Sequence, residues 1–221
     1  MDRRTFIMYS ATASAIAMFR GTMRGEPTAA FSGLPFDETL KIEKMKIVVL
    51  TGSPRKNGNS AILADRFIEG AQEAGHEVYR FDSAFKKVEG CMACNRCGMD
   101  GSCVLDDDFA ALRPHLIAAD MVVFATPMYY FGLSAQLKKV IDRFYSVNGQ
   151  IKGAHKKAAL LMTYADTSDK EAEPMLAHYA TLLHYLGWEN AGTVVAPGVW
   201  TAGSIRNTEY PEKAYRLGKH S

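Results

Sequence analysis

All four cysteines of the chain lie in one short segment, CMACNRCGMDGSC, at residues 91–103. They are Cys91, Cys94, Cys97 and Cys103, and their spacing is C-x2-C-x2-C-x5-C. Thiols gathered in this way can ligate a metal, form a redox-active dithiol or close disulfides. Which of these they do depends on what the rest of the chain supplies.

Three kinds of sulfur chemistry fit this spacing to different degrees. Three cysteines at intervals of three residues can surround one face of an iron–sulfur cubane. Gly98 and Gly101 permit the turns that would bring Cys103 back as a fourth ligand. Arg96 could offset the negative charge of a cluster bound by four thiolates. Structural zinc more often uses two separated C-x2-C pairs, and disulfides here would close tight loops that add little stability. We therefore expect one [4Fe-4S] cluster, with disulfides or free thiols as the alternatives.

A polar loop, TGSPRKNGNS at residues 51–60, follows an apolar run that is typical of a buried strand. Its hydroxyls and amides, with the backbone N–H groups at the start of the next helix, suit a phosphate group. Arg55 and Lys56 add positive charge. The sequence has neither the G-x-x-x-x-G-K-S/T motif of nucleoside triphosphatases nor the G-x-G-x-x-G motif of dinucleotide sites. These residues favour a phosphate monoester.

A second loop, TPMYYFGLSAQLK at residues 126–138, follows another apolar run and holds three consecutive aromatic residues. They are Tyr129, Tyr130 and Phe131, and Gly132 comes next. Large aromatic side chains at a loop tip favour a flat partner or another subunit. A phosphate site after one strand and an aromatic platform after another together indicate a site for flavin mononucleotide (FMN).

Alternating strands and helices must position these loops. Short apolar runs alternate along the chain with segments of helical periodicity. We expect strands at residues 46–52, 76–82, 121–127, 156–164 and 192–198, and helices at residues 59–75, 106–120, 134–147, 173–188 and 211–220. Repeated strand–helix units predict a parallel sheet covered on both faces. In such sheets ligands bind beyond the carboxyl ends of the strands, where both loops fall.

These motifs resemble those of a known family. The segments VLTGSPRKNGNS and FATPMYYFGLSAQLKKVIDRF, with the cysteine spacing, are similar to the flavodoxin-like NADPH-dependent FMN reductase family and, within it, to the iron-sulfur flavoprotein branch. The similarity covers about residues 45–220. It implies an α/β fold of three αβα layers around a doubly wound, five-stranded parallel sheet of order 2-1-3-4-5. It also implies FMN at the strand ends and a homodimer or homotetramer.

The resemblance also assigns binding residues. FMN phosphate would be held by Ser53, Arg55, Asn57, Asn59 and Ser60, and the flavin ring would be lined by Pro127, Met128, Tyr129, Tyr130, Phe131 and Gly132. A third loop, often glycine-rich in relatives, is TYAD here, with Thr163 and Asp166 as candidates. The cluster ligands would be Cys91, Cys94, Cys97 and Cys103. No catalytic side chain is expected beyond the flavin, because the cofactor performs the chemistry. Tyr145, Trp188 and Trp200 are expected in the core or at a subunit contact.

The N-terminal segment differs from the rest of the chain. Arg3 and Arg4 precede an uncharged run at residues 6–19, which is shorter than the roughly 20 residues of a membrane span. The pattern resembles a twin-arginine export signal. We expect a signal peptide at residues 1–30, a linker at residues 31–44, an FMN-binding domain at residues 45–221 and a periplasmic or exported location. If translation starts at Met45 instead, the protein would be cytoplasmic.

The charge balance limits the classes of partner that we expect. The chain has 26 basic and 24 acidic residues, a net charge of +2 and no basic stripe, so no nucleic-acid partner is expected. We expect an FMN-dependent oxidoreductase or electron-transfer flavoprotein that passes electrons between the cluster and FMN. Its partner would be a redox protein or a small-molecule electron acceptor. Two alternatives remain open: an NAD(P)H-dependent FMN or quinone reductase without a cluster, and an electron carrier without a substrate of its own.

Overall fold

The computed structural model of the protein describes residues 43–221. The predicted signal peptide at residues 1–30 and the predicted linker as far as residue 42 lie outside the described residues. Within residues 43–221, no helix is long and apolar enough to cross a membrane.

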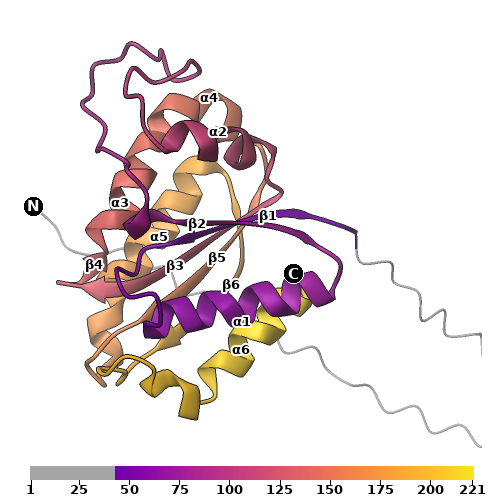
Figure 1. The fold of residues 1–221 in the computed structure, drawn as a ribbon, viewed down its shortest axis with the longest axis vertical. Coiled ribbons are helices and arrows are strands. Elements are labelled where there is room, and N and C mark those ends of the chain that lie inside the picture. The colour runs from indigo at the N-terminus through magenta and orange to yellow at the C-terminus, as the bar shows by residue number, and fades with distance from the viewer. Residues whose placement is uncertain (1–42) are drawn as a thin grey trace, which may run out of the picture. The chain divides into compact units, whose positions relative to one another are not determined.

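One sheet forms the centre of the described domain (Figure 1). Across residues 43–221 it has six strands, and five of them run parallel in the order β2-β1-β3-β5-β6. The parallel strands are β1 (Lys46–Thr51), β2 (Glu77–Asp82), β3 (Met121–Tyr129), β5 (Lys157–Thr163) and β6 (Glu189–Ala196). The remaining strand, β4 (Gly132–Leu133), pairs antiparallel with β3. Without β4 the order is the predicted 2-1-3-4-5, so the predicted fold class is confirmed.

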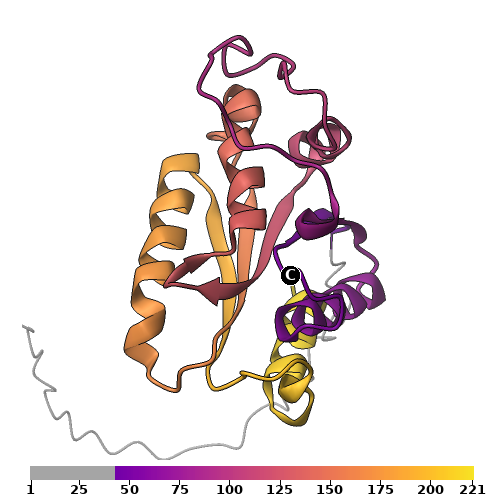
Figure 2. The same cartoon turned by 60° about the vertical axis from the view of Figure 1, so that its left-hand side comes forward.

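Helices cover both faces of the sheet and make three layers (Figures 1 and 2). One face carries α1 (Asn59–Glu73) and α6 (Tyr210–Lys219), and the other carries α2 (Phe109–Ala118), α3 (Ala135–Asp142) and α5 (Glu173–Leu186). Alternate residues of a strand point to opposite faces. In β1, Val49 joins the core beneath α1 and α6, whereas Leu50 joins the core beneath the other three helices. Burial on both faces is why these strands are continuous apolar runs in the sequence.

Glycines bring α1 and α6 close together. A Cβ on Gly70 of α1 would collide with the carbonyl oxygen of Tyr215 in α6, and a Cβ on Gly218 of α6 would collide with the carbonyl oxygen of Phe67. Two helices without side chains at their contact can approach until their backbones touch. The position of α1, whose N-terminus follows the first polar loop, is fixed by this contact.

Several elements differ from the prediction at their ends. The helix predicted at residues 134–147 ends at Asp142 and continues as a 3₁₀ helix, Arg143–Val147, and as the short α4 (Asn148–Ile151). The helix predicted at residues 106–120 begins at Phe109, and the Asp107 carboxylate, just before the N-cap residue Asp108, accepts a hydrogen bond from the Phe109 N–H (3.1 Å). The last strand begins at Glu189, earlier than predicted.

Candidate functional site

A cleft of about 260 Å³ opens at the carboxyl ends of the central strands. Its lining comes from loops that are far apart in the chain. Of the predicted FMN residues it contains Ser53, Arg55, Asn59, Ser60, Pro127, Met128, Tyr129 and Thr163, and it also contains Gly58, Tyr164, Ala165, Val199 and Trp200. Five predicted residues, all within the described part of the chain, lie outside this lining: Asn57, Tyr130, Phe131, Gly132 and Asp166. The fold thus brings most of the predicted residues together.

The first loop folds tightly around Ser53. The Ser53 hydroxyl accepts a hydrogen bond from the N–H of Arg55 (3.1 Å) and donates one to its carbonyl oxygen (3.0 Å). A Cβ on Gly58 would lie 2.7 Å from this hydroxyl, so glycine keeps the loop closed. Gly58 precedes α1 and has no side chain to cap it. The first N–H groups of a helix lack intrahelical acceptors and carry partial positive charge, so this end of α1 suits an anion.

Ser134 joins the first loop to the second. Its buried hydroxyl donates to the carbonyl oxygen of Gly52 (2.8 Å) and accepts from the Leu137 N–H (3.4 Å), which caps α3. The Ser134 N–H donates to Oγ1 of Thr126 (3.2 Å). The ends of β1 and β3 and the start of α3 therefore form one hydrogen-bonded unit that fixes the two loops relative to each other.

The second loop is a tight, strained hairpin at the rim of the cleft. Tyr129 pairs with Gly132, and the two residues between them, Tyr130 and Phe131, have φ values of 45° and 63°. Left-handed backbone costs about 1–2 kcal/mol per non-glycine residue, and Asn or Gly is the usual choice in such turns. Tyr130 is fully exposed, and its two aromatic neighbours are about half exposed. Strain of this kind at an exposed aromatic tip points to a contact with a ligand or partner.

Asn59, a predicted phosphate ligand, uses its side chain to order another segment. Its Nδ2 donates to the carbonyl oxygens of Val199 (3.0 Å) and Thr201 (2.9 Å), and its Oδ1 accepts from the Ile205 N–H (3.4 Å). These bonds fix the segment that carries Trp200. Trp200 is 78% exposed and lines the cleft, so it is not a core residue. Sequence reasoning missed it as a cleft residue, because nothing local connects it to the first loop.

The third loop, at residues 163–166, closes the cleft without a glycine. None of these four described residues has a positive φ, so the backbone of this loop does not require a glycine. The Tyr164 carbonyl oxygen accepts a hydrogen bond from the Val199 N–H (3.0 Å). Burial raises the pKa of Tyr164 above its ordinary value. Asp166 serves a turn instead, because its Oδ1 accepts from the Ser168 N–H (2.8 Å).

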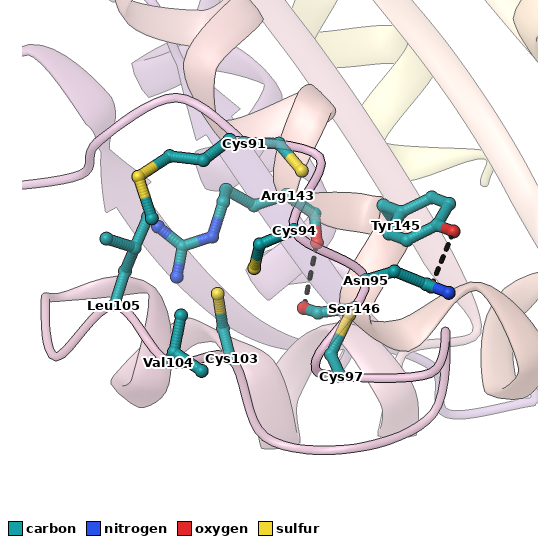
Figure 3. Close-up of a pocket in the computed structure, with 11 residues that line it drawn as sticks. Cys91, Cys94, Asn95, Cys97, Cys103, Val104, Leu105, Arg143, Tyr145 and Ser146 are labelled. Carbon is teal, nitrogen blue, oxygen red and sulfur yellow. Dashed lines mark hydrogen bonds between the residues drawn. The ribbon is translucent and has the colours of Figure 1, made fainter.

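The four cysteines line a second, smaller pocket of about 10 Å³, which we term the cysteine pocket (Figure 3). All four thiols are free: Cys91 and Cys94 are exposed, and Cys97 and Cys103 are half-buried. In Figure 3 the thiols of Cys94 and Cys103 point toward each other. Within residues 43–221, no group of three or more His, Cys, Asp or Glu side chains has an arrangement that could hold a metal ion. The fold gathers the thiols but does not place them as a finished ligand set.

The cysteine segment is held against neighbouring elements by its backbone. The Asp100 carbonyl oxygen accepts hydrogen bonds from Arg113 Nη2 (2.8 Å) in α2 and from Gln150 Nε2 (2.9 Å) in α4. A Cβ on Gly149 would collide with the Asp100 carboxylate, so a larger residue there would displace that side chain. The segment is therefore docked on the fold rather than free in solution.

The same segment contains strained backbone. Ala93, Asn95 and Met99 have φ values of 54°, 56° and 71°. Such conformations are unfavourable for Ala and Met and persist only where the surrounding structure imposes them, often at functional sites. The Asn95 side chain accepts a hydrogen bond from the Tyr145 hydroxyl (2.9 Å). Tyr145 therefore contacts the cysteine segment, whereas Trp188 is a core residue, as expected.

A buried ion pair lies beside the cysteine pocket. Arg143 is 1% exposed, and its Nη1 donates to Asp107 Oδ2 (2.7 Å) and to the Glu89 carbonyl oxygen (3.0 Å). Burial alone would raise the pKa of Asp107, but hydrogen bonds from Arg143 and from the Glu89 and Phe109 N–H groups outweigh it and lower the pKa below its ordinary value. The Asp107 carboxylate is therefore ionised at neutral pH. Sequence reasoning missed Arg143 and pointed to Arg96, which is exposed and outside the pocket lining.

Comparison with known sequences identifies relatives of this chain. The profile of the NADPH-dependent FMN reductase family matches residues 45–205. An iron-sulfur flavoprotein of Archaeoglobus fulgidus is 34% identical over 176 residues, which are 79% of this chain and 77% of that protein. An iron-sulfur flavoprotein of Methanosarcina thermophila is 36% identical over 99 residues, 45% of this chain and 52% of that protein. The chain thus spans about half the length of this second relative.

A solved structure shares the architecture. The NAD(P)H:quinone oxidoreductase from Methanothermobacter marburgensis superposes with a TM-score of 0.64 at 21% sequence identity, over 80% of this chain and 96% of that chain. At this identity the likeness is one of fold, and it agrees with the flavodoxin-like arrangement of the sheet and helices.

Proposed function

Because the chain belongs to the NADPH-dependent FMN reductase family, we propose that this flavin-dependent oxidoreductase binds FMN in the cleft and a [4Fe-4S] cluster at Cys91, Cys94, Cys97 and Cys103. Electrons would pass between the two centres and on to a redox partner protein or a small-molecule acceptor. The exposed hairpin at the rim of the cleft is the surface that such an acceptor would meet.

One observation gives the main support for a cluster: the four free thiols share a pocket with the buried Arg143, whose Nε–H donor has no hydrogen-bond partner among the described residues. Four thiols are the ligand type and number that a cubane takes. The Arg143 Nε is buried and has no hydrogen-bond partner among the described residues, so it can donate to an anionic occupant. The thiols are exposed or half-buried, and their side chains would turn toward a common centre on binding. The donor set therefore fits the group by its chemistry.

The cleft residues can bind and orient FMN, which supplies hydride and single-electron chemistry when bound. The uncapped end of α1 and the closed loop at Ser53 would receive the phosphate. Arg55 adds positive charge at the same place. Tyr129 and Trp200 offer flat apolar faces to the ring. Asn59 would act indirectly, through the segment that carries Trp200.

Helix α3 connects the two sites. Ser134 caps its N-terminus and ties the FMN loops together, and Arg143 directly follows its last residue. Eight residues at 1.5 Å per residue span about 12 Å. This helix therefore joins the loops that would hold FMN to the arginine beside the cysteine pocket, and the two proposed cofactors would have separate ligands.

A second candidate function is NAD(P)H-dependent reduction of FMN or a quinone without a cluster. The family description and the unfinished ligand arrangement of the thiols favour it. Membership of an enzyme family makes an electron carrier without a substrate the weaker alternative.

Anaerobic purification of the full-length protein, followed by iron, sulfide and flavin analysis, separates these functions. We expect about one FMN and about four irons and four sulfides per chain, with broad absorbance beyond the flavin bands. Cys94→Ser should lower the iron content and leave FMN in place. Ser102→Ala, a matched change of an exposed residue in the same segment, should retain both. A yellow, metal-free wild-type protein that NADPH bleaches without a partner would contradict the cluster and support the reductase.

A further inference from the structure

A buried arginine beside the cysteine pocket is only partly explained by its contacts. Among lysines and arginines of the described part of the chain, only Arg143 and Lys156 are buried. Lys156 Nζ donates to the carbonyl oxygens of Ile117 and Ala119 near the end of α2, so its charge has partners. The Arg143 Nε, in contrast, is buried and has no hydrogen-bond partner among residues 43–221.

The Arg143 guanidinium is fixed by three neighbours. Its Nη1 donates to Asp107 (2.7 Å) and to the Glu89 carbonyl oxygen (3.0 Å), and its central carbon lies 4.9 Å from the centre of the Phe109 ring. The guanidinium plane therefore cannot turn to find another acceptor for Nε. Figure 3 shows this side chain among the residues that line the cysteine pocket, with its guanidinium on the side of Leu105 and Val104.

The charge at the pocket favours an anionic occupant. Of the described residues that line the cysteine pocket, Arg143 is the only one with a charged side chain. Its counter-ion Asp107 is not part of the lining. Thiolates and the clusters they ligate are negative, and a nearby positive charge stabilises the more negative state.

A purely structural role for Arg143 would explain the hydrogen bonds of its Nη1 but not its unpaired Nε. The Nη1 bonds join Glu89, just before the cysteine segment, to Asp107, just after it. They do not explain a charged donor kept buried and unpaired at the pocket, because an unsatisfied buried donor costs free energy that a neutral side chain would avoid.

We propose that Arg143 is a positioning residue for the cluster, with two effects: its Nε–H donates to a ligand sulfur, and its positive charge raises the cluster's reduction potential. The inference rests on the proposed function, because it requires the cluster. Hydrogen bonds to sulfur and local charge are among the factors that set cluster potentials. Asp107 has the opposite effect, since its carboxylate offsets part of the arginine charge.

Redox titration of the full-length holoprotein, followed by electron paramagnetic resonance, tests this with variants of opposite expected sign. The double change Arg143→Gln with Asp107→Asn removes both charges and keeps hydrogen-bonding groups. It should lower the equilibrium constant for cluster reduction at least about tenfold, which is about 59 mV for one electron. Asp107→Asn alone keeps the arginine charge and should raise that constant. Arg143→Lys keeps the charge but loses the Nε–H donor, so it should lower that constant, by less than the double change does.

The FMN potential in the same samples is the internal control, and it should not move because α3 separates the sites. If the double variant fails to fold or loses its cluster, the two single variants still test the role of Arg143, because the constant for cluster reduction should rise in Asp107→Asn and fall in Arg143→Lys. Shifts of the same sign in Asp107→Asn and the double variant, or none in either, would overturn the role of Arg143 alone. A wild-type protein without iron would instead overturn the proposed cluster itself.

Discussion

At the scale of single residues, two asparagines of the first loop have different surroundings. The resemblance assigns both Asn57 and Asn59 to the FMN phosphate. Asn57 is exposed and outside the cleft lining, whereas Asn59 is 8% exposed and bonded to Val199, Thr201 and Ile205. A residue that orders another segment affects binding through that segment, so the buried asparagine should matter more than the exposed one.

Asn59→Ala should weaken FMN binding about tenfold, or about 1.4 kcal/mol, because the segment that carries Trp200 loses three hydrogen bonds. Fluorescence titration of the flavin-free protein with FMN measures this, and the emission of Trp200 should change in parallel. Asn57→Ala is the matched control and should weaken FMN binding by less than about threefold. A larger loss for Asn57→Ala would show that a direct contact from the exposed side chain governs binding.

At the scale of elements, the hairpin between β3 and β4 combines strain with exposure. Two bulky aromatic residues occupy left-handed positions that glycine or asparagine fills at lower cost. Ser134 anchors the base of this hairpin to β1, so the strain is imposed by the fold. Such a turn is expected where the side chains are needed for function more than for stability.

Tyr130→Gly should therefore leave the free energy of unfolding unchanged or raise it by up to about 1 kcal/mol, because the left-handed strain is relieved and no buried area is lost. Turnover with a quinone acceptor should fall, since the exposed ring is removed. Urea unfolding and steady-state kinetics measure the two effects. Tyr129→Gly, in the adjacent strand position of the same hairpin, should lower stability instead. A clear loss of stability in Tyr130→Gly would mean that the turn is not strained.

At the scale of the whole molecule, the N-terminal segment lies outside the region that the family profile matches. The family profile and the described fold both lie after residue 42. We propose that residues 1–30 direct export through the paired Arg3 and Arg4. The predicted homodimer or homotetramer stays a prediction, and the exposed aromatic hairpin offers a surface for it.

Replacing Arg3 and Arg4 together by lysine should keep the protein inside the cytoplasm, because a twin-arginine signal is read by the arginine pair and not by charge alone. Cell fractionation with detection of the full-length protein measures its location. Arg20→Lys, outside the pair, should be exported like the wild type. Equal cytoplasmic location of all three forms would favour translation from Met45.

The order of the strands and helices, the three layers and the two cofactor loops follow from local sequence. Strands such as Lys46–Thr51 and Met121–Tyr129 are buried on both faces and therefore appear as continuous apolar runs. The polar and aromatic loops that follow them must meet, because parallel strands end at the same edge of the sheet. The four cysteines are close in space because they are close in the chain.

Only the tertiary structure decided which residues support these loops. Asn59 and Val199 are 140 positions apart, and Arg143 and Asp107 are 36 apart. A partial signal for Arg143 exists, because it lies three residues after Val140 and next to Phe144, on the apolar side of a helical pattern. The pattern marks it as buried but cannot name its partner. Periodicity records which face of an element is buried, whereas the partner of a buried polar group depends on how distant elements pack.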